Sequence, residues 1–227
     1  MKDLAQSKLV AIVGGSGAGK SWLTYRLQKI FSGEVNCACL DDFYLDRSHL
    51  SPSRRARVNY DHPRAIDWQS VAKFLQDCRN GHPCKLPHYD FKAHSRLSQW
   101  EPWFPKPLVL VEGLWLIWKP AIRCFFDFAI YLDCPASVRL HRRLVRDLAE
   151  RGRSRASIAR QFKNTVAPMH DVFVAPQARW ADIVLHEPVG ESDIQSLYYR
   201  LRGLLTNSRA DWRPRAQTTS GAYCHTD

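Results

Sequence analysis

One stretch near the amino terminus restricts the fold more than any other: residues 14–21 read Gly-Gly-Ser-Gly-Ala-Gly-Lys-Ser. This stretch fits the pattern G-x-x-x-x-G-K-[ST] of a phosphate-binding loop. An uninterrupted apolar run at residues 9–13 precedes it and predicts a buried strand. After it, Leu23, Leu27 and Ile30 recur at helical spacing. A strand, a glycine loop and a helix in this order are the context in which the motif binds a nucleotide.

Each part of this loop suits a bound phosphate chain. Glycines let the backbone turn its N–H groups toward a phosphate without a side-chain clash. The helix that follows directs its positive end at the same point. Lys20 supplies a mobile cation, and the hydroxyl of Ser21 is a ligand for Mg²⁺. The alternative is a glycine-rich turn that binds nothing, but the flanking strand and helix favour nucleotide binding.

The length and composition of the chain limit its possible architecture. With 227 residues, of which 45% are hydrophobic, the chain suits one α/β domain with a good core. No apolar run approaches the length of a membrane span, and no signal peptide is visible, so we expect a cytoplasmic protein. The seven cysteines are odd in number and scattered, which predicts reduced thiols.

The net charge of +11 permits nucleic-acid binding, a site for polyanionic small molecules, or merely solubility. Much of the excess lies in residues 139–163, on a helix that Pro135 is expected to open. Four arginines fall there at spacings that form one face: Arg139, Arg142, Arg143 and Arg146.

These arginines have few acidic neighbours in the sequence, so they are expected to repel one another unless an anion binds. The cluster continues past Gly152, a candidate hinge, with Arg151, Arg153, Arg155 and Arg160. We therefore predict a mobile cationic lid rather than an ordinary solvated helix face.

Acidic residues follow two of the expected strands. Residues 35–40 read as a strand that ends at Asp41 and Asp42, and the apolar run 108–111 ends at Glu112. Ligands of parallel α/β sheets collect beyond the carboxyl ends of the strands, where these carboxylates are placed for chemistry. For the aspartate pair a solvated turn stays an equal alternative, since Asp favours such positions. Glu112 resembles the acidic residue that supports Mg²⁺ in phosphoryl-transfer sites.

The remaining pattern completes one domain. Asp67 is expected to cap a helix that ends near Gly81, and residues 85–100 suggest a short strand pair outside the main sheet. The other expected segments are a polar basic loop at 48–57, an extended connector at 100–107, a strand at 128–132, a helix at 166–179 broken by Pro168 and Pro176, a strand at 183–185, a closing helix through 194–205 and a flexible tail at 208–227.

Several longer stretches together match a known family. They are GGSGAGKS at 14–21, DDFY at 41–44, NYDHPRAIDW at 59–68, LPHYDFKAHSR at 86–96, VLVEGLW at 109–115, RLHRRLVRDLAERGR at 139–153 and QFKNTVAPMHDVFVAPQARWADIVL at 161–185. In this order and at these spacings the sequence resembles the uridine kinases (uridine–cytidine kinases) of the phosphoribulokinase/uridine kinase group of P-loop kinases. The loop motif alone indicates only a P-loop protein, and the other stretches are far more specific.

The resemblance implies a three-layer α/β/α P-loop NTPase fold with a mostly parallel sheet. It implies one domain over residues 1–207, with a substrate hairpin at about 83–100, an arginine-rich lid at about 139–165 and a tail at 208–227. The implied activity uses ATP and Mg²⁺ to phosphorylate the 5′-hydroxyl of uridine, and of cytidine, in pyrimidine salvage. A nucleoside is then the partner, nucleic acid and membrane are not expected, and a homo-oligomer stays open.

The resemblance also implies roles for individual residues. The ATP phosphates are assigned to Gly14, Gly15, Ser16, Gly17, Ala18, Gly19, Lys20 and Ser21. The catalytic residues are Asp41 as general base, Lys20, and the lid arginines Arg146 and Arg151 on the transferring phosphate. The metal is assigned to Ser21, Asp41 and Glu112. Substrate binding is assigned to Tyr44, Tyr60, Asp61, Tyr89, Phe91, His94, Arg96, Arg143, Arg153 and Gln161.

Within the substrate set, Asp61 with Arg143 matches the residues that hold the ribose 2′- and 3′-hydroxyls. A carboxylate accepts from two adjacent hydroxyls at once, which selects ribose over deoxyribose. Tyr89 and His94 match residues that read the pyrimidine edge, since a histidine either donates or accepts. The flanking aromatic positions are Tyr60 and Phe91.

The sequence departs from the family in places. Asp42 stands where the family more often has a small residue, and residues 45–57, 98–107 and the tail after 207 do not match. Another acceptor, such as nicotinamide riboside or a phosphorylated pentose, therefore stays open. A third hypothesis is a nucleotide-gated RNA-binding regulator. The net positive charge favours it, but the sequence contains no recognised RNA-binding module.

Overall fold

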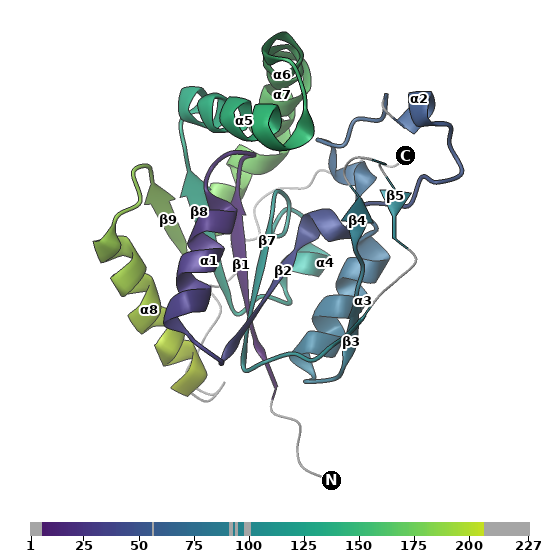
Figure 1. Cartoon of the computed structure of the whole chain (residues 1–227). Coiled ribbons are helices and arrows are strands. Elements are labelled where there is room, and N and C mark those ends of the chain that lie inside the picture. Colours follow the sequence, from purple (N-terminus) through teal and green to yellow (C-terminus); the bar gives the residue numbers. More distant parts are fainter. Residues whose placement is uncertain (1–5, 56, 91–92, 94, 98–100, 207–227) are drawn as a thin grey trace, which may run out of the picture.

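A five-stranded parallel sheet forms the centre of the computed structural model, which describes residues 6–55, 57–90, 93, 95–97 and 101–206 (Figure 1). In spatial order its strands are β2 (Val35–Cys39), β7 (Leu108–Gly113), β1 (Lys8–Gly14), β8 (Phe128–Asp133) and β9 (Ile183–His186). Each strand was expected from its apolar run, and β1 and β7 are almost fully buried, as central parallel strands are.

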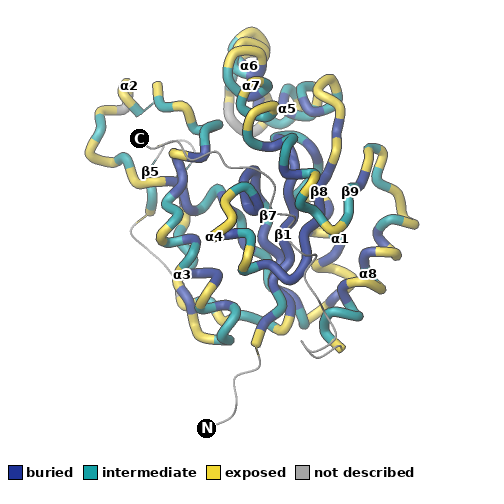
Figure 2. The backbone as a smooth tube through the Cα atoms, turned by 180° about the vertical axis from the view of Figure 1, so that it is seen from behind, coloured by how far each residue is buried: buried dark blue, intermediate teal, exposed yellow. Residues whose placement is uncertain are grey.

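Helices cover both faces of this sheet. On one face lie α1 (Lys20–Ile30) and α8 (Glu191–Thr206), and on the other lie α3 (Trp68–Arg79) and the one-turn α4 (Pro120–Arg123) (Figure 1). Figure 2 shows the strands as the buried interior between these layers. Buried side chains accordingly form two clusters, one on each side of the sheet. The expected three-layer α/β/α arrangement is confirmed.

The helix α3 forms where its cap and its apolar stripe predict it. Asp67 caps the helix, because its side chain accepts a hydrogen bond from the backbone N–H of Ser70 at 3.1 Å. The stripe of Val71, Phe74, Leu75 and Cys78 is buried against the sheet. In the connection before it, a one-turn helix α2 (Pro52–Arg55) lies inside the stretch that was expected to be a loop.

Two small antiparallel sheets lie beside the main one, where a single strand pair was expected. One pairs β3 (Cys84–Leu86) with β6 (Glu101–Trp103), and the other pairs β4 (Tyr89–Asp90) with β5 (Ser95–Arg96). The segment expected to be a plain connector, 100–107, therefore contains a paired strand. Pro102 is tolerated there because β6 pairs on one side only.

The helix α5 (Ala136–Arg151) follows Pro135 as expected and ends at Gly152, which adopts a left-handed conformation with φ of 60°. The next helical segment begins earlier than the sequence suggested, at Arg155 rather than at residue 166. It runs through α6 (Arg155–Gln161), η3 (Phe162–Val166), α7 (Ala167–Met169), η4 (His170–Val174) and η5 (Ala175–Trp180).

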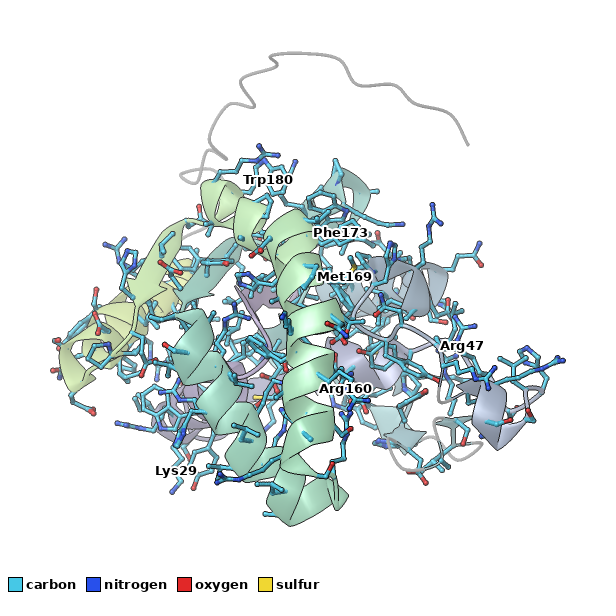
Figure 3. All side chains as sticks on the ribbon, turned by 90° about the horizontal axis from the view of Figure 1, so that it is seen from above. Lys29, Arg47, Arg160, Met169, Phe173 and Trp180 are labelled. Atoms are coloured by element: carbon cyan, nitrogen blue, oxygen red, sulfur yellow. The ribbon has the colours of Figure 1, made fainter. Side chains whose placement is uncertain are left out.

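Pro168 does not break this segment. The turns on both sides of it, η3 and η4, are wider π turns, which bond each N–H to the fifth preceding residue and so accommodate a missing donor. Seen from above, Arg160, Met169, Phe173 and Trp180 follow one another along the segment (Figure 3). The expected break at Pro168 is therefore wrong, whereas Pro176 does fall in a tighter 3₁₀ turn.

The expected flexible tail at 208–227 lies outside the described residues, so the structure does not test it. In the part of the chain that the structure covers, every cysteine is a free thiol, as expected, and Cys78 Sγ lies 3.5 Å from Cys84 Sγ. None of the described helices combines the length and the apolar character that crossing a bilayer requires.

Candidate functional site

The glycine loop lies between β1 and α1 and has the conformation that its glycines permit. Gly17 and Gly19 have φ angles of 84° and 95°, in the left-handed region that other residues rarely adopt. A Cβ at Gly17 would also lie 2.6 Å from the backbone oxygen of Arg139 in α5. The ammonium group of Lys20 donates to the carbonyl of Gly15 at 3.1 Å and so bends back over the loop.

A cavity of about 240 Å³ opens above this loop. It lies at the carboxyl ends of β1, β7 and β2, which are neighbours in the sheet. The side chains that give it chemical character are Lys20, Ser21, Asp41, Glu112, Arg142 and Arg146. A cation, a hydroxyl, two carboxylates and two arginines from four separate segments of the chain thus share one space.

Asp41 reaches this cavity from η1 (Leu40–Phe43), a 3₁₀ turn that begins directly after β2. The neighbouring Asp42 is directed differently: it lies near His88, and the backbone N–H of Tyr89 donates to its carboxylate. Burial raises the pKa of Asp42 to about 6, an effect that His88 opposes and Asp41 reinforces. Of the two aspartates, only Asp41 lines the cavity, which favours it over Asp42 for chemistry.

The charges at the base of the cavity are partly desolvated. Burial lowers the pKa of Lys20, while the carboxylates of Glu112 and Asp41 oppose the shift. Burial likewise raises the pKa of Glu112, and here Lys20 and a hydrogen bond from Ser21 oppose it. The two groups therefore stabilise each other's charged forms.

These residues fit a magnesium ion. The Oε2 atom of Glu112 is buried and has no hydrogen-bond partner among the described residues. A buried carboxylate oxygen without a donor suits a cation or a water bound to one. No group of three or more Cys, His, Asp or Glu side chains in the described chain is arranged to hold a metal by itself. Asp41 and Glu112 line the same cavity, and Mg²⁺ is usually held by one or two carboxylates together with substrate phosphates.

A second cavity, of about 260 Å³, adjoins the first and shares Gly19, Trp22 and Arg142 with it. Its other walls are Ala18, Leu132, Glu187 and Val189, so it is more apolar. Arg142 and Glu187 form a two-point ion pair at its edge, with N–O distances of 3.1 and 2.5 Å. Arg142 is therefore neutralised by a residue 45 positions later in the chain.

The buried side of α5 is charged rather than apolar. Arg139, Arg143 and Asp147, one turn apart from each other, are at most 4% exposed, whereas Leu148 is 38% exposed. Arg139 donates to the carbonyl of Cys134 at 3.1 Å and lies over the ring of Phe162, so it serves packing. The helix presents its polar face to the site.

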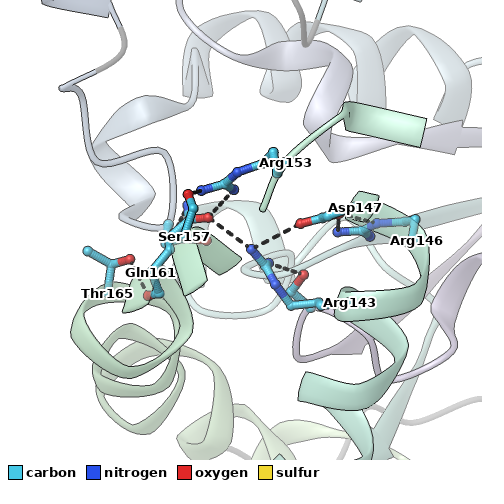
Figure 4. Close-up of polar contacts among 9 residues, drawn as sticks. Arg143, Arg146, Asp147, Arg153, Ser157, Gln161 and Thr165 are labelled. Atoms are coloured by element: carbon cyan, nitrogen blue, oxygen red, sulfur yellow. Dashed lines mark hydrogen bonds and ion pairs between the residues drawn. The ribbon is translucent and has the colours of Figure 1, made fainter. Parts of the chain in front are cut away.

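Asp147 corrects our expectation that the arginines of this helix lack acidic partners. Its carboxylate, which is fully buried, contacts Arg146 at 2.8 Å and Arg143 at 3.7 Å (Figure 4). With Arg142 held by Glu187, three of the four arginines have carboxylate partners, and Arg139 has a carbonyl. Mutual repulsion is therefore compensated within the protein, and a bound anion is not needed to hold these residues together.

A hydrogen-bonded chain joins the predicted ribose residues to the glycine loop, and Figure 4 shows its members Arg143, Arg153 and Gln161. Gln161 donates to the carboxylate of Asp61 at 3.3 Å, and its carbonyl oxygen accepts from Arg143 at 3.2 Å and from Arg153. Arg143 also donates to the hydroxyl of Ser16 at 2.7 Å. Four predicted substrate residues are thus brought into one network.

A small gap lies on one side of Asp61. The gap between it and the loop residues Gly15 and Ser16 has a volume of about 10 Å³, and His170 and Met169 form part of its wall. That is about the space of one water molecule. Burial raises the pKa of Asp61, and the charge of Arg143 opposes the shift.

The predicted aromatic residues form a compact group. Tyr44, Tyr60 and Tyr89 have ring centroids 5.1 to 6.4 Å apart, and the hydroxyl of Tyr44 donates to the carbonyl of Tyr60. Tyr44 and Tyr89 are each 6% exposed and belong to the core, whereas Tyr60 is half-buried. Arg96 ties this group to α3, because it donates to the carbonyl of Tyr44 and pairs with Asp67 at 3.3 Å.

Three predicted site residues are not placed. Phe91 and His94 lie outside the described residues, and so does the side chain of Arg151. Conversely, sequence reasoning missed Asp147, Glu187 and Trp22. The spacing of four between Arg143 and Asp147 was a signal for the first, since such pairs meet on a helix. No sequence pattern predicts that Glu187 or Trp22 belongs to the site.

Comparison with known proteins agrees with this geometry. Residues 9–195 match the Phosphoribulokinase / Uridine kinase family. The uridine kinase of Staphylococcus haemolyticus is 40% identical over 185 residues, which cover 81% of this chain and 89% of that protein. The uridine kinase of Staphylococcus carnosus is 37% identical over 205 residues, covering 88% and 98%. The fold is similar to that of phosphoribulokinase from Rhodobacter spheroides, with a TM-score of 0.59 and 14% identity over 80% of this chain and 70% of that one.

Proposed function

Because the chain belongs to the phosphoribulokinase/uridine kinase family of P-loop kinases, we propose that it transfers the γ-phosphoryl group of ATP to the 5′-hydroxyl of uridine. The products are UMP and ADP, and cytidine is expected to be a second acceptor. Relatives at 37 to 40% identity over most of the chain carry the name uridine kinase, which supports this acceptor.

One observation supports the proposal most. Lys20, Asp41, Glu112 and Arg146 line a single cavity above the glycine loop, although they come from distant parts of the chain. Phosphoryl transfer requires positioning and neutralisation of charge more than covalent chemistry. A cavity with a lysine and arginines for the phosphates and a carboxylate for the acceptor supplies both.

On the donor side, the loop residues Gly14 to Ser21 hold the phosphates, and Lys20 and Arg146 neutralise the transferring group. Arg151 is expected to join them. Ser21, Asp41 and Glu112 would hold Mg²⁺, which neutralises phosphate charge when it is bound. The buried, unpaired oxygen of Glu112 supports this assignment.

On the acceptor side, Asp41 accepts the proton of the 5′-hydroxyl, and Asp61 accepts hydrogen bonds from the 2′- and 3′-hydroxyls. Gln161 donates to Asp61, and Arg143 and Arg153 hold Gln161 by donating to its carbonyl oxygen. Since the gap between Asp61 and the glycine loop has room for about one water, we expect the segment 155–174 to shift when a ribose binds. Tyr60, Tyr89, Phe91 and His94 are proposed for the base, and Tyr44 and Arg96 for the support of Tyr60 and Tyr89.

A phosphorylated sugar is the weaker alternative. The many arginines in the sequence would suit the phosphate of such an acceptor. In the structure, however, Arg142, Arg143 and Arg146 already have carboxylate partners. A further anionic group on the acceptor would compete with those carboxylates.

The test is release of ADP from ATP–Mg²⁺ in a coupled assay with a panel of acceptors. Uridine and cytidine should support turnover, and 2′-deoxyuridine should support far less, because it offers Asp61 one hydroxyl fewer. Nicotinamide riboside and a phosphopentose are the comparison compounds. A higher kcat/KM for either of them than for uridine would refute the assignment of the acceptor.

A further inference from the structure

Trp22 lies at the boundary of the two cavities. It is the second residue after Lys20, in the first turn of α1, and it lines both spaces. Its side chain is 43% exposed, although tryptophan is highly buried on average in folded proteins. An open indole beside a phosphate-binding loop therefore needs an explanation other than the core.

The second cavity has the chemistry of a site for a flat, largely apolar group. Ala18, Leu132, Val189 and Trp22 provide apolar surface, and Arg142 and Glu187 provide the polar edge. The cavity adjoins the phosphate cavity, because Gly19, Trp22 and Arg142 line both. A ligand whose phosphates lie at Lys20 is therefore beside this space with its next group, and in a nucleotide that group carries the base.

The indole ring is also held in place. The guanidinium group of Arg26, one turn further along α1, lies over the ring at 5.4 Å from its centroid. Arg26 is in turn paired with Glu191 at the start of α8, at 2.6 Å. A ring restrained in this way loses little freedom when a ligand stacks on it.

We propose that Trp22 stacks on the base of the phosphate donor and raises its affinity without selecting among bases. This inference rests on the proposed use of ATP as the donor. Stacking on an aromatic ring is tolerant of the base, because every base has a π-face. Selection among purines would fall to the polar edge of the cavity, at Arg142 and Glu187.

The test compares equilibrium binding of Mg²⁺–ATP, Mg²⁺–GTP and Mg²⁺–tripolyphosphate by calorimetry. Trp22→Ala should weaken both nucleotides by similar factors of about 5 to 150, the range of one base–aromatic stack. Tripolyphosphate has no base, so its binding should not change. Trp22→Phe retains a ring and should stay within about threefold of the unaltered protein.

Tyr25→Ala is the matched control. Tyr25 lies one turn from Trp22 on the same helix, is 51% exposed and carries its own cation, Lys29, at 4.7 Å, but it lines neither cavity. Its replacement should change no binding constant, and thermal unfolding of each variant verifies that it folds.

Two results would overturn the inference: unchanged nucleotide binding in both Trp22 variants, or equal weakening of ATP and tripolyphosphate. In turnover assays Trp22→Ala should raise the KM for ATP and leave that for uridine unaltered. Because binding is measured without an acceptor, an inactive protein that still binds ATP would refute only the uridine assignment. A protein that binds no ATP would refute both proposals.

Discussion

The guanidinium group of Arg143 donates a hydrogen bond at 2.7 Å to the hydroxyl of Ser16, a residue of the glycine loop. The same guanidinium reaches Gln161, which holds Asp61. One arginine thus contacts both the phosphate side and the proposed ribose side of the site. Binding of ATP and binding of the nucleoside are therefore expected to influence each other through Arg143.

Replacing Asp41 by Asn should lower kcat steeply, by about 100-fold or more, because general base catalysis contributes factors of this size. Binding of ATP should stay nearly intact, since Lys20 and the loop are unchanged and Ser21 and Glu112 remain as the other proposed ligands of Mg²⁺. Steady-state kinetics and calorimetry of ATP binding measure the two effects. Asp42→Asn is the control and should retain most of the activity, and near-normal turnover of Asp41→Asn would remove it from the role of base.

Replacing Asp61 by Asn should reduce the preference for ribose. A hydrogen bond to a charged group contributes about 1.5–3 kcal/mol, so kcat/KM for uridine should fall about 10- to 150-fold. The value for 2′-deoxyuridine should fall less, because that acceptor already lacks one of the two hydroxyls. The exposed Asp46→Asn serves as the control, and an equal loss for both acceptors would contradict the assignment.

Replacing Asp147 by Asn should destabilise the protein and weaken catalysis together. Removing one partner of a buried ion pair costs about 3–5 kcal/mol, and here Arg143 and Arg146 both lose a carboxylate. Urea unfolding measures the loss, with Asp77→Asn as a control at the surface pair with Lys73. ATP should stabilise Asp147→Asn more than the unaltered protein, since its phosphates replace the missing charge, and equal stabilisation would count against this role for Asp147.

Asp67 gives a stability that depends on pH. Burial acts to raise its pKa, but hydrogen bonds from Ser70 and the charge of Arg96 outweigh it, so the pKa lies below the ordinary 3.8. For a lowered pKa, the stabilisation is full above 3.8 and is lost as the pH falls through the folded-state value.

Asp67→Ala should therefore lose about 1 kcal/mol of unfolding free energy at pH 7, the usual contribution of such a cap. The difference from the unaltered protein should shrink near pH 3. Asp67→Asn keeps a capping oxygen and should lose less at pH 7. Urea unfolding at both pH values measures these differences, and a loss that stays constant with pH would show that the charge of Asp67 has no part in it.

Much of the fold could be predicted because its signals are local. The apolar runs of β1 and β7 and the cap and stripe of α3 each specify their element within a few residues. The strands β4 and β5 have only two residues each, which is too short for a periodic pattern to show. The helical path through Pro168 could not be predicted either, since π turns have no sequence signal of their own.

The site, too, has features that local motifs predict and features that depend on contacts between distant residues. The glycine loop follows from a local motif, and the end of a predicted strand made Asp41 a candidate. Asp61 and Gln161, 100 positions apart, were assigned to one site only through the family resemblance, and their direct contact was not predicted. The pairing of Arg142 with Glu187 depends on how α5 meets the end of β9. The sequence does not show this contact. The many arginines and few acidic neighbours in residues 139–146 therefore suggested that the helix requires a bound anion.

The two small sheets have a consequence for how such a protein changes over time. They pair within themselves and are separate from the five strands whose ends carry Lys20, Asp41 and Glu112. Insertions at the exposed turns between β3 and β6 are therefore expected to leave the hydrogen-bonded register of the central strands unchanged. On this architecture we expect the acceptor to change more readily than the phosphate chemistry.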